Sequence, residues 1–63
     1  MSNQFWRLPK VQQETGLSRT SIFRKMEDGT FPKSFKITER SVAWLSDEVE
    51  QWKAARLAVR EAA

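Results

Sequence analysis

The sequence predicts a mainly α-helical domain with one small β-hairpin, and two observations support this fold class. Apolar residues recur at helical spacing in two short stretches that Gly16 separates, and again in a longer stretch after residue 45. Between the second and third of these stretches, apolar and polar residues alternate as they do in β-strands. With 63 residues the chain can bury one small core. We therefore expect a single domain over residues 1–63.

A short first helix is expected to begin around Pro9 and to end at Thr15, after an extended start over residues 1–7. Proline is favoured in the first turn of a helix, where its missing N–H would have no partner. Val11 lies on the apolar face of this helix, which is too short to bury much area and must pack against the next one. Gly16 is expected to end the helix in the left-handed conformation.

A second helix is expected from Arg19 to Asp28, with Ser18 as its cap and Gly29 as its stop. At about 100° per residue, one side is apolar and the other carries small hydroxyls and cations. The apolar side holds Ile22, Phe23 and Met26, and the opposite side holds Thr20, Ser21, Arg24 and Lys25. Two such helices with a short turn are typical of a helix-turn-helix, and this polar front suits a DNA major groove. The alternative is that the front is only a solvated polar face.

Two alternating stretches predict a hairpin with its turn at Glu39 and Arg40. In that register the apolar residues pair on one face, with Ile37 opposite Val42 and Phe35 opposite Trp44. The hairpin would then be a small wing that presents Lys36 and Arg40. The alternative is that it only closes the core.

A third helix is expected from Ser46 to about the C-terminus. Ser46 would cap it, and acidic residues in the first turn would interact favourably with the helix dipole. The expected apolar stripe contains Leu45, Val49, Trp52 and Val59, with the stem of Arg56 lying on Trp52. Leu57 falls off this stripe and is expected to be exposed, which fits either a weak contact between copies or no function at all.

The composition argues against catalysis and metal binding. The chain has no Cys and no His, so the usual thiolate and imidazole ligands and the commonest acid–base catalyst are absent. The carboxylate pairs Glu27-Asp28 and Asp47-Glu48 lack the alternating spacing of a calcium loop. We expect no enzymatic activity, no metal or other cofactor and no small-molecule substrate.

The positive charge is concentrated in the first two thirds of the chain. Residues 1–40 carry eight cations and four acids, whereas residues 41–63 carry three cations and four acids. The basic surplus therefore accompanies the helix-turn-helix and the segment after it, which indicates a polyanionic partner.

Membrane and export signals are missing from the sequence. No apolar run approaches the roughly 20 residues of a membrane span, and the N-terminus lacks the apolar core of a signal peptide. We expect a cytoplasmic protein with no membrane partner.

Several motifs in this order resemble a known family. They are Arg7-Leu8-Pro9, Thr15-Gly16-Leu17-Ser18-Arg19, Gly29 with Phe31-Pro32-Lys33, and Trp44 followed by Glu48-Val49 and Trp52. Over residues 7–56 the chain resembles the AlpA-type prophage regulators and their excisionase relatives, within the MerR-like winged helix-turn-helix superfamily. The family often carries glycine before the arginine that matches Arg40, so the tip of the wing departs from the pattern.

The resemblance implies a sequence-specific, double-stranded DNA-binding regulator of phage or bacterial origin, or an excisionase that bends DNA beside an integrase. We expect Ser18, Arg19 and Lys33 to hold phosphates, and Thr20, Ser21, Arg24 and Lys25 to face base edges. Lys36 and Arg40 would reach the backbone or the minor groove. Trp44 and Trp52 are assigned to the core rather than to stacking on bases.

Other partners stay open at this stage. Self-association on DNA and contact with an integrase or RNA polymerase are compatible with the sequence. An alternative of another class is an adaptor that binds a repressor or integrase through the third helix, using the acidic residues 47–50 and Leu57.

Overall fold

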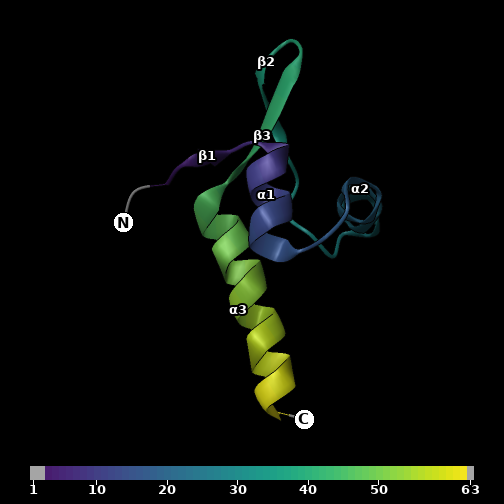
Figure 1. The fold of residues 1–63 in the computed structure, drawn as a ribbon, viewed down its shortest axis with the longest axis vertical. Coiled ribbons are helices and arrows are strands. Elements are labelled where there is room, and N and C mark those ends of the chain that lie inside the picture. The colour runs from purple at the N-terminus through teal and green to yellow at the C-terminus, as the bar shows by residue number, and fades with distance from the viewer. Residues whose placement is uncertain (1–2, 63) are drawn as a thin grey trace.

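The computed structural model describes residues 3–62, with side chains up to Val59, and shows three helices and a small antiparallel sheet (Figure 1). In chain order the elements are β1 (Phe5–Trp6), α1 (Leu8–Thr15), α2 (Arg19–Asp28), β2 (Phe35–Thr38), β3 (Ser41–Leu45) and α3 (Ser46–Ala62). The strand order is β1-β3-β2, so β3 is central. The β2–β3 hairpin and the C-terminal half of α3 project from opposite ends of the body, and α2 lies to one side (Figure 1). None of the described helices is both long enough and apolar enough to cross a membrane.

The first two helices and the turn between them agree with the local sequence signals. Gly16 and Gly29 have φ of 73° and 78° and end α1 and α2 in the left-handed conformation. The Oγ of Ser18 accepts a hydrogen bond from the N–H of Ser21 at 3.1 Å, which caps α2. The predicted bounds of α2 are confirmed, and α1 begins at Leu8, one residue before Pro9.

The turn glycine gives a first test. Apart from Gly16 itself and its two chain neighbours, no heavy atom lies within 4 Å of the place where a Cβ would stand, so a side chain there would meet strain only in the backbone. Gly16→Val is expected to lower the free energy of unfolding by about 1–3 kcal/mol, because a β-branched residue strongly disfavours positive φ. Urea denaturation measures the loss. Gly16→Asn is the matched control and should lose less, since asparagine tolerates this conformation; equal losses would contradict the backbone explanation.

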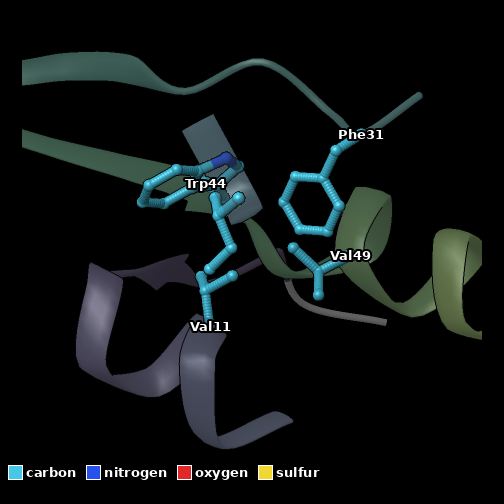
Figure 2. Packing of buried hydrophobic residues seen from close by; sticks show 5 residues of the cluster. Val11, Phe31, Trp44 and Val49 are labelled. Carbon is cyan, nitrogen blue, oxygen red and sulfur yellow. The ribbon is translucent and has the colours of Figure 1, made fainter. Parts of the chain in front are cut away.

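The core is a compact cluster contributed by every helix, the central strand and the loop after α2. It consists of Val11, Ile22, Phe31, Trp44 and Val49, each at most 4% exposed. In Figure 2 the side chains of Val11, Phe31, Trp44 and Val49 point toward one another. Phe23, Met26 and Trp52 pack against this cluster while remaining partly exposed. The assignment of Trp44 to the core is confirmed, and Trp52 lies at its margin.

The pairing of β2 with β3 differs from the predicted register. The paired residues are Phe35–Ala43, Lys36–Val42 and Thr38–Ser41, with an irregularity between Lys36 and Thr38. Ile37 is therefore an extra residue on β2, and the register shifts by one beyond it. The predicted pairs of Ile37 with Val42 and of Phe35 with Trp44 are wrong. Because successive residues of a strand face opposite sides, Phe35 shares a sheet face with Ala43, away from Trp44.

A third strand, β1, lies along the other side of β3. Phe5 is opposite Leu45 and Trp6 is opposite Trp44. The ring of Phe5 packs edge-on against Phe35 with 5.0 Å between centroids, although Phe5 is 61% exposed. The sequence predicted only an extended start here, because a two-residue strand has no periodicity of its own to detect.

The start of α3 is held by the N-terminal segment. Gln4 donates its N–H to the Oγ of Ser46 at 2.8 Å and accepts the N–H of Ser46 on its carbonyl at 2.9 Å. The N–H of Asp47 donates to the Oδ1 of Asn3 at 3.2 Å. Ser46 was expected to be the cap, but its hydroxyl is engaged by Gln4 and a first-turn N–H is satisfied by Asn3. The capping expectation is therefore wrong, because a distant segment provides the acceptor.

The apolar stripe of α3 is buried only near its start. Val49 is fully buried, and the guanidinium carbon of Arg56 lies 5.1 Å from the ring centroid of Trp52, as expected. Val59 is 65% exposed, so its predicted burial is wrong. The described part of α3 extends beyond the body at this end, where no other described element reaches it (Figure 1). Leu57 is 53% exposed, which confirms its predicted exposure.

Candidate nucleic-acid interface

The outward face of α2 carries Thr20 and Arg24, both exposed and one helical turn apart. The ion pairs among the described side chains join Lys10 and Lys53 to carboxylates on α1 and α3, and none involves Arg24. Asp28, four residues after Arg24 on the same helix, forms no ion pair with it within this described part. The guanidinium of Arg24 is thus available to an external acceptor.

Sequence reasoning missed Glu27, which is exposed and lines the same shallow hollow as Thr20 and Arg24. A residue at this position lies about 60° from Arg24 around the helix, so the spacing itself could have indicated it. The outward face of α2 therefore carries an acidic side chain as well as hydroxyl groups and an arginine.

The two serines at the start of α2 are engaged with each other. The hydroxyl of Ser18 donates to the Oγ of Ser21 at 3.0 Å while accepting the Ser21 N–H. A hydroxyl carries one donor and two acceptor positions, so the proton of Ser21 Oγ remains free for an outside acceptor. Ser18 is mainly a cap, and Ser21 has the greater capacity for a ligand.

Arg19 is held at the N-terminal end of α2 by an aromatic ring. Its guanidinium carbon lies 5.6 Å from the ring centroid of Phe23, which in turn lies 6.2 Å from the ring of Trp44. A cation above an aromatic face is stabilised by the ring quadrupole. Aromatic residues at the edge of the core thus help to hold this exposed cation in place. Because Arg19 and Phe23 are four residues apart on one helix, this contact could have been predicted from the sequence.

Lys25 lies on a different flank of α2 from Thr20 and Arg24. It is half-buried and lines a hollow of about 400 Å³ with residues of α1 and α3, including Trp52 and Leu57. The four residues predicted to share a polar front are therefore not all brought together.

The remaining predicted residues fall into two places. Lys33 is exposed in the loop after α2 and lines a hollow with Phe23, Met26 and the C-terminal end of that helix. Lys36 and Arg40 are exposed on the projecting β2–β3 hairpin, where the N–H of Arg40 donates to the Oγ1 of Thr38 at 3.3 Å (Figure 1). The structure thus brings Lys33 beside α2, whereas Lys36 and Arg40 lie on the hairpin, separate from that helix.

A charged cluster links α1 to α3. The Nζ of Lys53 lies 2.8 Å from Oε1 of Glu14, and the Nζ of Lys10 lies 3.1 Å from Oε2. The hydrogen bond from Lys53, followed by that from Lys10, lowers the pKa of Glu14 below its ordinary value of 4.5. The same bond raises the pKa of Lys53. These three residues serve to join helices.

The lowered pKa of Glu14 predicts a pH dependence of stability. A group whose folded pKa is depressed stabilises fully above its unfolded pKa, and this contribution is lost as the pH falls through the folded pKa. The melting temperature should therefore fall as the pH drops below about 4.5, the ordinary pKa of a glutamate, and Glu14→Gln should reduce that fall. Glu39→Gln, in the exposed hairpin turn, is the control. If both variants keep the wild-type pH profile, the cluster does not contribute to stability.

Comparison with known proteins places the chain in a class of prophage regulatory proteins. A family model described as prophage CP4-57 regulatory protein (AlpA) matches residues 4–57. The uncharacterized protein ORF88 of Enterobacteria phage P4 is 40% identical over 58 residues, which cover 92% of this chain and 66% of that protein. The DNA-binding transcriptional activator AlpA of Escherichia coli (strain K12) is 36% identical over 56 residues, which cover 79% of this chain and 80% of that protein.

The chain belongs to the AlpA family of prophage regulatory proteins. The resemblance to AlpA-type prophage regulators inferred from the sequence motifs is thereby confirmed. The chain spans just under two thirds of the phage P4 relative.

Proposed function

We propose that this protein binds double-stranded DNA in a sequence-specific manner and regulates transcription in a prophage or related mobile element. The observation that carries the proposal is the exposed guanidinium of Arg24 at the middle of the outward face of α2, with no ion-pair partner among the described residues. An arginine in that position suits bidentate recognition of guanine. Support also comes from the relative in Escherichia coli, which is named a DNA-binding transcriptional activator.

In this proposal residues 1–63 act as one winged helix-turn-helix domain in the cytoplasm. α1, the turn and α2 form the helix-turn-helix, and the β2–β3 hairpin is the wing. α2 enters the major groove. Base edges are assigned to Thr20, Ser21 and Arg24, with Lys25 at the flank of the helix. Phosphates are assigned to Ser18, Arg19 and Lys33, and the DNA backbone or minor groove to Lys36 and Arg40.

A footprinting experiment tests the proposal. The protein is incubated with DNA from its own genomic neighbourhood in the presence of excess random competitor, and a protected segment is expected. A site over a promoter would support transcriptional regulation, whereas a site beside an attachment sequence would support the excisionase alternative. Absence of any protection would contradict the proposal and favour an adaptor that needs a partner protein.

The wing makes a separate prediction. Arg40 is exposed in the turn of the projecting β2–β3 hairpin, so its guanidinium is accessible to a DNA phosphate. Arg40→Ala should weaken binding on all sequences and make the salt dependence shallower by about one unit of slope, because one phosphate contact is lost. If Arg40 instead enters a minor groove, the loss should grow on sites flanked by A·T tracts. Titration at several salt concentrations separates these cases.

Glu39→Ala is the matched control for the wing, since Glu39 is the exposed neighbour of Arg40 in the same turn. Removal of this acid should not weaken binding. If Arg40→Ala changes neither affinity nor slope, the hairpin has a structural role and does not touch DNA.

A further inference from the structure

The loop between α2 and β2 is held by two tryptophan side chains from other parts of the chain. The Nε1–H of Trp52, on α3, donates to the carbonyl of Thr30 at 2.8 Å. The Nε1–H of Trp44, on β3, donates to the carbonyl of Pro32 at 3.0 Å. Two indole donors separated in the fold thus bind carbonyls that are two residues apart in one loop.

The residue between these carbonyls is anchored as well. Phe31 is 4% exposed and packs edge-on against Trp52 with 5.0 Å between ring centroids. Figure 2 shows Phe31 directed into the core toward Val49. On the helix side, the N–H of Thr30 donates to the carbonyl of Lys25 at 2.9 Å. The loop is therefore fixed to the end of α2, to β3 and to α3 at once.

Lys33 is the first residue after this fixed segment. It is exposed and lines a hollow with the C-terminal end of α2, as described above. Since Pro32 has a restricted φ and a carbonyl bound to Trp44, the backbone that leads into Lys33 has little freedom. A binding group whose backbone is already ordered loses less conformational freedom when it engages a ligand.

The bond from Trp52 is poorly explained by stability alone. Thr30 is exposed, so water can satisfy its carbonyl when the indole N–H is absent. Losing that N–H would leave no buried polar group unsatisfied, and the main consequence would be a freer loop. This hydrogen bond therefore adds to the anchoring of the loop that leads into Lys33 and leaves the packing of the core largely untouched.

We infer that Trp52 and Trp44 are positioning residues for DNA binding, whose indole N–H groups fix the Thr30–Pro32 segment so that Lys33 meets a DNA phosphate beside α2. This inference rests on the proposed DNA-binding function. It gives the two tryptophans a role beyond the core-filling one that the sequence suggested.

The test uses Trp52→Phe, which removes the N–H and keeps an aromatic ring against Phe31. Affinity for the footprinted site is measured over a range of salt concentrations, with the melting temperature as a check on folding. Trp52→Phe should lower affinity several-fold and make the slope of log K against log salt shallower by about one unit, as Lys33→Ala should. In the Lys33→Ala background, Trp52→Phe should have no further effect.

Trp6→Phe is the matched control, because the Nε1–H of Trp6 donates to the exposed side chain of Gln4, outside the loop, at 3.2 Å. It should leave affinity and salt slope unchanged. A second substitution at position 52, the tryptophan analogue benzothienylalanine, replaces the N–H with sulfur while retaining the ring volume. It keeps the test valid if Trp52→Phe does not fold.

Two results would overturn the inference. One is that removal of the N–H lowers affinity by the same factor with and without Lys33. The other is that affinity or salt slope stays at the wild-type value although Lys33→Ala changes both. If wild-type protein binds no DNA at all, the proposed function itself fails, which is a separate outcome from either of these.

Discussion

Replacement of Trp44 by alanine is expected to abolish cooperative folding near room temperature. Trp44 is fully buried on the central strand, packs among Val11, Phe31 and Val49, and donates its N–H to the carbonyl of Pro32 (Figure 2). Truncation of a buried tryptophan to alanine costs about 3–5 kcal/mol. The single core of a domain this small rarely supplies more than about 3–5 kcal/mol in total. The loss is therefore as large as the stability available.

Circular dichroism during heating measures this outcome, and the wild-type sigmoidal transition should be replaced by a shallow, non-cooperative change. Trp6→Ala is the matched control. Trp6 is half-buried on the edge strand β1, so its truncation should lower the melting temperature while preserving a cooperative transition. If Trp44→Ala unfolds as cooperatively as Trp6→Ala does, the core does not depend on the central indole.

Features that depend on a few neighbouring residues were predictable from the sequence. The bounds of α2 follow from Ser18 and Gly29, and the end of α1 follows from Gly16, because capping and left-handed glycines act within one turn. The contact of Arg56 with Trp52 likewise follows from their spacing of four residues on one helix.

Features that depend on distant segments were not predictable in the same way. The alternating pattern of the hairpin contains no sign of the extra residue at Ile37, so the register was placed one residue out. The acceptor for the first turn of α3 comes from Asn3, which is far away in the sequence. Val59 continues the apolar spacing of α3, but the described helix has by then extended past the elements that could cover it.

The candidate site shows the same division. Sequence identified the residue types of α2, and the helical period correctly placed Thr20 and Arg24 outward. The helical period did not distinguish Lys25 from these two residues, because the flank of α2 that becomes covered depends on where α3 packs. The indole bonds to the loop before Lys33 join residues far apart in the chain, so no local pattern indicates them.

Replacement of Arg24 by alanine is the decisive test of base recognition. If the guanidinium binds a guanine edge, Arg24→Ala should cost about 1–3 kcal/mol of binding free energy on the specific site and much less on random DNA. The reason is geometric, since a bidentate contact is lost only where the matching base is present. Gel-shift titrations of both duplexes under identical salt conditions measure the two losses.

Arg56→Ala is the matched control, because it removes the same charge from an exposed position on α3, where the guanidinium lies over Trp52. That variant should change affinity little on either duplex, which would show that the effect of Arg24 is not one of net charge. Equal losses on specific and random DNA from Arg24→Ala would assign this residue to a phosphate instead. Sequence recognition would then have to come from Thr20 and Ser21, whose hydroxyls contact bases less selectively than arginine contacts guanine.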